Sequence, residues 1–179
     1  MYFKTSYQSP IGRLTLASDG EALIGLWLEN QKYFAATVRE EMADEHDLPV
    51  LAAAQDWLDR YFAGEKPAIG LLPLAPGGGA FRQEVWKILC GIPYGATLSY
   101  GGIAQRIAVR LNKTGMSAQA VGGAVGHNPI SIIIPCHRAV GTDGSLTGYA
   151  GGVDKKAWLL THEGVEMKKL KIPSRGTAL

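Results

Sequence analysis

The stretch Asn128-Pro129-Ile130-Ser131-Ile132-Ile133-Ile134-Pro135-Cys136-His137-Arg138 sets an apolar run directly before a thiol, an imidazole and a guanidinium. A continuous apolar run that ends at a proline is typical of a short buried strand, and we expect one over 130–134. Functional side chains concentrate where a chain leaves the core of a domain. The stretch therefore predicts a reactive group at Cys136.

A cysteine is nucleophilic as its thiolate, and the ordinary thiol pKa of about 8.5 leaves little thiolate near neutral pH. His137 can accept the thiol proton, and an imidazole is a better base when its other ring nitrogen donates to a carboxylate. Five acidic residues of the second half could supply that carboxylate: Glu84, Asp143, Asp154, Glu163 and Glu166. Glu163, at the end of an apolar helix, is the best placed. The alternative for Cys136 is an inert buried side chain, the role that we assign to Cys90.

The rest of the second half is predicted to be mostly helical. Apolar spacing predicts helices over 81–89, 99–107, 117–125 and 154–162. The middle two flank a short loop and predict a helix-turn-helix variant, although helical hairpins are also common packing units. The tail from Lys168 onward is expected to be poorly packed.

The first half begins with a different pattern, in which apolar and polar residues alternate around a turn. The predicted elements are, in order, a hairpin of strands 11–18 and 22–28, helices over 31–45 and 50–63, and an edge strand over 69–74. The stretch Pro76-Gly77-Gly78-Gly79 is the clearest flexible joint, and we place the domain boundary there.

The composition suits a folded protein of one or two small domains. The chain has 179 residues, 46% of them apolar, which excludes disordered, collagen-like and coiled-coil classes. It has no apolar run of 18 residues and its first residues do not read as a signal peptide, so we expect a cytoplasmic protein that binds no membrane. Two cysteines and four scattered histidines predict neither a disulfide framework nor a metal site.

Charge is distributed unevenly along the chain. Residues 1–80 carry 6 Lys and Arg against 11 Asp and Glu, a net charge of −5, whereas residues 81–179 carry 12 against 5, a net charge of +7. A basic half is either a solvated surface or a surface for a polyanion such as nucleic acid. The charge alone does not distinguish a solvated surface from a surface that binds nucleic acid, and only the sequence motifs can distinguish them.

Several motifs of the second half occur together in one known family. They are Leu98-Ser99-Tyr100, Ala120-Val121-Gly122-Gly123-Ala124, Pro135-Cys136-His137-Arg138, Gly148-Tyr149-Ala150-Gly151-Gly152 and Trp158-Leu159-Leu160-Thr161-His162-Glu163-Gly164. With them the chain resembles the methylated-DNA-protein-cysteine methyltransferases, also called O6-alkylguanine-DNA alkyltransferases. The motifs cover about residues 81–165, and the first half resembles the family only in architecture.

The resemblance implies an α+β fold with two domains. The first is a small ribonuclease-H-like scaffold domain of a sheet and helices, over 1–76. After a linker over 77–80, a winged helix-turn-helix-like domain over 81–165 binds DNA and accepts the alkyl group. Residues 166–179 form the tail.

The resemblance also implies direct DNA repair, in which an alkyl group moves irreversibly and once from O6-alkylguanine in duplex DNA to Cys136, without a cofactor. His137 then acts as the base through a water, Glu163 orients it, and Asn128 braces the thiolate region. The expected substrate contacts are Tyr100, which donates to the base, Ala139, Tyr149 and Gly151. Activity on O4-alkylthymine is left open.

The implied DNA contacts lie in the second helix of the helix-turn-helix. They are Ser117, Ala118, Gln119, Gly122 and Gly123. The resemblance implies docking in the minor groove with low sequence specificity, and extrusion of the target base from the stack. The protein is expected to act as a monomer.

The chain departs from the family pattern at three positions. Gln119 stands where members usually carry the arginine that fills the gap left by the extruded base, so we expect weaker extrusion or weaker DNA affinity. Gly79 replaces a frequent threonine cap, and Ala150 replaces a serine hydroxyl found in some members.

Three other functions fit part of the sequence. A lesion-binding protein of the same fold would bind alkylated guanine without repairing it, although that group lacks the cysteine. A cysteine hydrolase that uses Cys136 and His137 would turn over many times. A transcriptional helix-turn-helix protein would prefer one DNA sequence and would not depend on Cys136.

Overall fold

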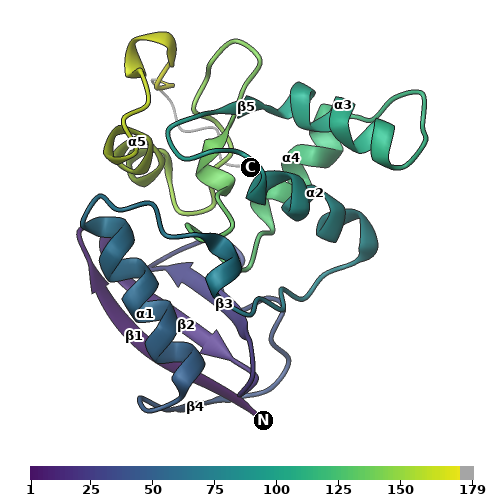
Figure 1. Cartoon of the computed structure of the whole chain (residues 1–179). Helices are drawn as coiled ribbons and strands as arrows, with labels where there is room; N and C mark the ends of the chain where they lie inside the picture. Colours follow the sequence, from purple (N-terminus) through teal and green to yellow (C-terminus); the bar gives the residue numbers. More distant parts are fainter. Residues whose placement is uncertain (174–179) are drawn as a thin grey trace. The chain divides into compact units, whose positions relative to one another are not determined.

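The computed structural model describes residues 1–173, which form two compact units. The first unit comprises Met1–Gly78 and the short segment Pro129–Ile133, and the second comprises Gly79–Asn128 and the chain from Ile134. The first unit contains a sheet with one long helix, and the second is mainly helical (Figure 1). The predicted α+β class is confirmed, whereas the domain limits drawn from the sequence stay a prediction.

The first unit is built on a four-stranded sheet with the strand order β3-β2-β1-β4. The antiparallel strands β1 (Tyr2–Ser9), β2 (Gly12–Ser18) and β3 (Leu23–Leu28) follow one another along the chain, and β4 (Met42–Asp44) pairs in parallel with β1. The predicted hairpin is confirmed as β2 and β3. The sequence does not predict β1, because its polar and apolar residues do not alternate cleanly.

Helix α1 (Pro49–Phe62) packs on this sheet (Figure 1), as the spacing over 50–63 predicts. Its residues Leu51 and Leu58 are completely buried, as are Leu14 of β2 and Leu26 of β3. A proline is tolerated in the first turn because the N–H that it lacks has no partner within the helix there. The apolar layer between helix and sheet is the core of the first unit.

The helix predicted over 31–45 is wrong. Tyr33 and Ala35 have φ values of +61° and +52°, and left-handed residues interrupt a right-handed helix. The chain instead makes turns before it enters β4. Its apolar spacing reflects burial in another form, because Val38 and Met42 pack against the buried cluster that contains Trp27.

Two predicted strands are also wrong. Over 69–74 the chain forms the short 3-10 helix η1 (Ile69–Leu71), and only Leu74 makes a bridge, to Leu23. Over 130–134 only Ile130 makes a bridge, to Leu26 of β3. Ile132 has a φ of +70°, which turns the chain and prevents continued strand pairing. The run is buried as predicted, but in a turn.

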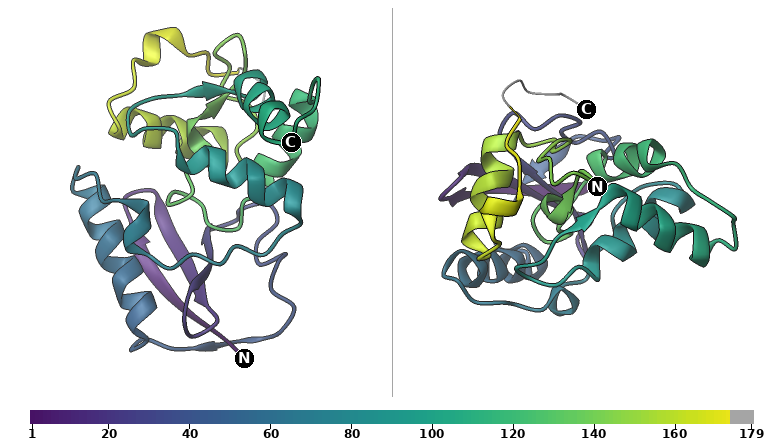
Figure 2. Two further views of the ribbon diagram at one scale, coloured as in Figure 1. Left: turned by 45° about the vertical axis from the view of Figure 1, so that its right-hand side comes forward. Right: turned by 90° about the horizontal axis from the view of Figure 1, so that it is seen from above.

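Three helices of the second unit, α2 (Ala80–Cys90), α3 (Tyr100–Arg110) and α4 (Ala118–Gly126), pack against one another (Figure 2). They confirm the three helices predicted there. The Ser99 and Ser117 hydroxyl oxygens accept hydrogen bonds from the first turns of α3 and α4 and cap their N-termini. α2 follows a glycine and has no side-chain cap, as predicted.

The second unit also contains α5 (Val153–His162), which confirms the last predicted helix. The 3-10 helix η2 (Cys136–Arg138) leads into β6 (Ala139–Val140), which pairs in parallel with β5 (Leu98–Ser99). This pairing sets the start of α3 beside the segment that carries the thiol.

Within residues 168–173 the expectation of a poorly packed tail is wrong for Leu170, whereas the side chains of Lys168, Lys169, Lys171 and Ile172 are exposed, as expected. Met167, the first residue of the 3-10 helix η3 (Met167–Lys169), and the following Leu170 pack on a buried cluster of the second unit. The Lys171 carbonyl then accepts a hydrogen bond from the backbone N–H of Leu146. Residues 174–179, where the rest of the predicted tail falls, lie outside the described residues.

Candidate active site

Cys136 begins η2, directly after the buried apolar run, and the residue is 5% exposed. Nδ2 of Asn128 donates a hydrogen bond to the carbonyl oxygen of Ile134, 2.8 Å away. This bond joins the two ends of the buried run and fixes the turn that precedes the thiol. Burial raises the pKa of Cys136, while a hydrogen bond with Asn128 and the positive charge of Lys156 oppose that rise. The resting thiol is therefore protonated and needs a base.

His137 and Glu163 form a pair whose side chains have no solvent exposure. Nε2 of His137 lies 2.6 Å from Oε1 of Glu163, which is 26 residues away in the sequence. Because a carboxylate faces Nε2, that nitrogen carries the proton and Nδ1 is the basic atom. Burial lowers the pKa of His137 in spite of the opposing effect of Glu163, so the imidazole is neutral at pH 7. Within residues 1–173 no hydrogen-bond partner reaches Nδ1.

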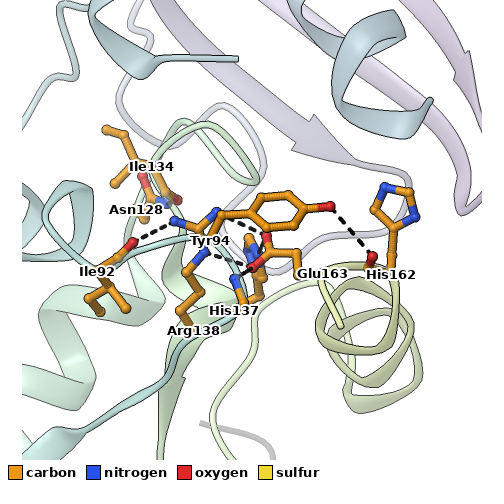
Figure 3. A network of polar contacts seen from close by, with 9 residues as sticks. Ile92, Tyr94, Asn128, Ile134, His137, Arg138, His162 and Glu163 are labelled. Carbon is orange, nitrogen blue, oxygen red and sulfur yellow. Dashed lines mark hydrogen bonds and ion pairs between the residues drawn. The ribbon is translucent and has the colours of Figure 1, made fainter. Parts of the chain in front are cut away.

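Arg138 binds the same carboxylate (Figure 3). Its Nε donates to Oε2 of Glu163 at 2.8 Å and its Nη2 donates to Oε1 at 3.0 Å, while Nη1 donates to the carbonyl oxygen of Ile92 at 2.6 Å. Burial raises the pKa of Glu163, but hydrogen bonds from His137 and Arg138 outweigh burial and hold that pKa well below its ordinary value. The sequence predicts that Arg138 lies beside the thiol but predicts no role for it at the site.

Lys156 is a second buried cation, and it is not among the site residues predicted from the sequence. Its Nζ donates to the carbonyl oxygens of Ala139, at 2.5 Å, and Thr147, at 2.9 Å. Burial lowers the pKa of Lys156 to about 8. One signal was available in the sequence, because Lys156 shares a helical face with the buried residues Leu159 and Leu160 of α5.

The two tyrosines expected to contact substrate lie near this cluster. Tyr100 begins α3, its hydroxyl donates to the Thr147 carbonyl at 3.0 Å, and its ring centre lies 5.8 Å from Nζ of Lys156. Tyr149 is buried, and its hydroxyl has no hydrogen-bond partner in the described chain. Burial first, and then the nearby Cys136, raise the pKa of both hydroxyls. Both tyrosines therefore stay protonated and can donate.

The remaining predicted substrate contacts lie on the segments around these tyrosines. Ala139 opens β6 and is completely buried, and its carbonyl oxygen accepts the hydrogen bond from Lys156. Gly151 lies in the turn just before α5 and is half-buried.

The residues predicted to contact DNA lie together on α4 and its cap. Ser117, Ala118 and Gln119 are exposed. A Cβ atom added at Gly122 or Gly123 would meet no atom within 4 Å. Packing inside the protein therefore does not require these two glycines, and they leave the helix backbone open to close approach from outside.

Two further properties of the described chain concern metal binding and membrane insertion. Residues 1–173 contain no group of three or more His, Cys, Asp or Glu side chains that could hold a metal ion. No helix described there combines the length and the apolar character that crossing a membrane requires. Cys90 is half-buried on α2, and burial raises its pKa.

Comparison with known proteins assigns both units to one family. Residues 2–76 match the ribonuclease-like domain of 6-O-methylguanine DNA methyltransferase, and residues 80–165 match its DNA-binding domain. The methylated-DNA–protein-cysteine methyltransferase of Haemophilus influenzae is 41% identical over 175 residues, which cover 98% of this chain and 90% of that protein. The protein of the same name from Shigella flexneri is 52% identical over 109 residues, 61% of each chain.

A solved structure agrees with these matches. The crystal structure of Mycobacterium tuberculosis OGT in complex with DNA is similar with a TM-score of 0.77, at 41% identity and with 94% of each chain covered. Sequence and fold point the same way along nearly the whole chain: it belongs to the 6-O-methylguanine DNA methyltransferase family.

Proposed function

We propose that this protein repairs DNA by transferring the alkyl group of O6-alkylguanine to the sulfur of its own Cys136. The observation that carries the proposal is the buried set of contacts that joins Asn128, Cys136, His137 and Glu163. It sets a protonated thiol next in sequence to a neutral, oriented imidazole, which is the arrangement that activates a nucleophile. Relatives that cover nearly the whole chain carry the name of this activity.

The first step moves a proton. The thiol proton of Cys136 passes to Nδ1 of His137 through one water, the relay that the family resemblance implies. The imidazolium that forms is stabilised at Nε2 by the carboxylate of Glu163. The positive charge of Lys156 favours the thiolate, because it opposes the effect of burial on the pKa of Cys136.

The second step moves the alkyl group. The thiolate attacks the alkyl carbon, a carbon–sulfur bond forms, and the carbon–O6 bond breaks with its electron pair left on guanine. Tyr100 turns its hydroxyl from the Thr147 carbonyl to the base and donates a hydrogen bond as this negative charge develops. The thiol proton ends on guanine, so the products are an unmodified base and a thioether. Since water does not cleave a thioether under these conditions, each molecule reacts once.

The duplex must be opened for this reaction. The O6 atom lies inside the base stack, so a sulfur fixed in a protein turn reaches the alkyl carbon only after the nucleotide is extruded. We assign docking to α4, where Gly122 and Gly123 leave the backbone open and Gln119 is exposed. The basic second half adds attraction to phosphates that does not depend on sequence.

Intact mass spectrometry after incubation with duplex DNA that contains O6-methylguanine tests the proposal. We expect one methyl group per molecule, located at Cys136 by peptide mapping, and no methylation of Cys136→Ser. Cys90→Ser is the matched control and should be methylated like the parent protein. A protein that stays unmodified beside excess lesion would contradict the proposal.

Binding and turnover assays on the same proteins separate the other functions. Lesion binding without methylation would identify a binding protein, and repeated turnover on esters or amides would identify a hydrolase. Binding of one unmodified DNA sequence that is unaffected by Cys136→Ser would identify a transcription factor.

A further inference from the structure

Arg138 is the buried charged side chain of the site that the reaction described above does not use. It is 7% exposed, and its three hydrogen bonds, to Glu163 and to the Ile92 carbonyl, stay inside the second unit. Two of them bind both oxygens of Glu163, in the planar two-point geometry that a guanidinium provides and an ammonium cannot. The third, to the Ile92 carbonyl, anchors the guanidinium to the chain after α2.

The shared carboxylate links Arg138 to the base. Oε1 of Glu163 accepts from both Nε2 of His137, at 2.6 Å, and Nη2 of Arg138, at 3.0 Å. Oε2 accepts from Nε of Arg138 at 2.8 Å and from the backbone N–H of Gly95 at 3.3 Å. The carboxylate is thus held from both sides, and its negative charge is divided between a permanent cation and an imidazole.

We propose that Arg138 is a positioning residue for the alkyl transfer: it fixes Glu163 toward Nε2 of His137 and neutralises that carboxylate, so that His137 rests neutral with Nδ1 as the proton acceptor. The inference rests on the proposed function for its kinetic part only. Without the guanidinium, an unbalanced buried carboxylate would favour the imidazolium before the thiol could deliver its proton. An imidazole that is already protonated cannot act as the base.

The charges around His137 agree with this role. Among its electrostatic neighbours Glu163 favours the imidazolium, whereas Arg138 and Lys156 disfavour it, in addition to burial. The other titratable groups of the cluster come from η2, α2, the start of α3 and the loops packed around them: Cys136, Cys90, Tyr94, Tyr100 and Tyr149. Each of these five is neutral near pH 7, and burial raises its pKa further. Arg138, in an ion pair with Glu163, is the cation that directly balances that carboxylate.

The decisive measurement is the pH profile of single-turnover methyl transfer from duplex DNA with O6-methylguanine. The rate falls on the acid side when His137 is protonated. Arg138→Gln should move that acid limb to higher pH and slow transfer at pH 7 by about tenfold or more. Arg106→Gln is the matched control, since it removes one exposed arginine of α3 that takes no part in the site, and it should leave the limb unchanged.

Arg138→Lys separates charge from geometry. The lysine keeps a cation near Glu163 but cannot bind both oxygens, so the limb should move less than in Arg138→Gln while the rate still falls. The Arg138→Lys variant also keeps the proposal testable if the Arg138→Gln variant does not fold. A wild-type rate and a wild-type limb in Arg138→Lys would overturn the proposal. A slower Arg138→Gln variant whose acid limb stays at the wild-type pH would also overturn the proposal. A purely structural role would lower the rate without moving the acid limb of the pH profile.

A second readout needs no alkyl transfer. Nitrogen NMR of the His137 ring should show Nε2 protonated and Nδ1 unprotonated in the parent protein, with a titration that moves to higher pH in Arg138→Gln. An unchanged titration would refute the role of Arg138 even if methylation proceeds. Absence of methylation together with a shifted titration would refute the proposed function and leave the role of Arg138 standing.

Discussion

The ammonium group of Lys156 lies 2.5 Å from the carbonyl oxygen of Ala139, although the lysine is completely buried. This hydrogen bond joins α5 to β6, the strand that directly follows the reactive turn. A buried charge is tolerated when its donors are paired, and the Thr147 carbonyl accepts a second hydrogen bond. The contact therefore couples the ionisation of a lysine to the stability of the site.

Stability should depend on the ionisation of Lys156. Its pKa in the folded protein is about 8, against 10.5 for an ordinary lysine, so the unfolded chain binds more protons between these pH values. Stability contributed by this group therefore rises as pH increases from 8 to 10.5, by up to about 3 kcal/mol. Lys156→Met should lack that rise. Urea unfolding of both proteins at pH 7.5 and pH 9.5 checks this, and parallel changes in the two would contradict it.

Glu163→Gln should slow methyl transfer by about 10–100-fold, because the amide cannot stabilise the imidazolium as a carboxylate does. It should also lower the stability of the protein at pH 7. Since the pKa of Glu163 is depressed in the folded protein, the carboxylate stabilises above the ordinary glutamate pKa of 4.5 and loses this effect as the pH falls below it. The difference in free energy of unfolding between the parent protein and Glu163→Gln, measured by urea unfolding, should become smaller as the pH is lowered. A difference that does not depend on pH would argue against an ionised Glu163.

Gln119→Arg should speed repair of duplex DNA. Gln119 is exposed on α4, and an arginine there adds a cation and a planar surface that can fill the space left by the extruded base. We expect a several-fold faster single-turnover rate on duplex substrate. Gln105→Arg, an exposed position of α3, adds the same charge elsewhere and should change the rate less. Equal or slower repair by Gln119→Arg would reject the idea.

Gly123→Ala should separate folding from DNA binding. The added methyl group meets no protein atom within 4 Å and favours the helix, so the free energy of unfolding should rise by about 0.5–1 kcal/mol. DNA affinity should fall by about tenfold if the helix backbone approaches DNA there. Gly115→Ala, also open but in the loop before α4, is the control. Unchanged affinity of Gly123→Ala would place the DNA contact elsewhere.

Local features of the sequence predicted much of the fold. The helices over 50–63, 81–89 and 154–162 were legible because their apolar residues recur at helical spacing and glycine follows them. The predictions for 31–45 and 130–134 failed because apolar spacing reports burial and not backbone conformation. The left-handed φ values of Tyr33, Ala35 and Ile132 depend on tertiary packing, which nothing in the local pattern discloses.

The sequence by itself determined that a thiol and an imidazole are adjacent at 136 and 137, because covalent order places them there. It also predicted that Glu163, of the five acidic residues in the second half, is the carboxylate partner of His137. Only the tertiary structure decided that Glu163 receives Arg138 and His137 together, and that Lys156 points into the protein rather than to solvent. Such contacts join residues many positions apart, and they exist only because packing excludes water and leaves buried charges no other partners.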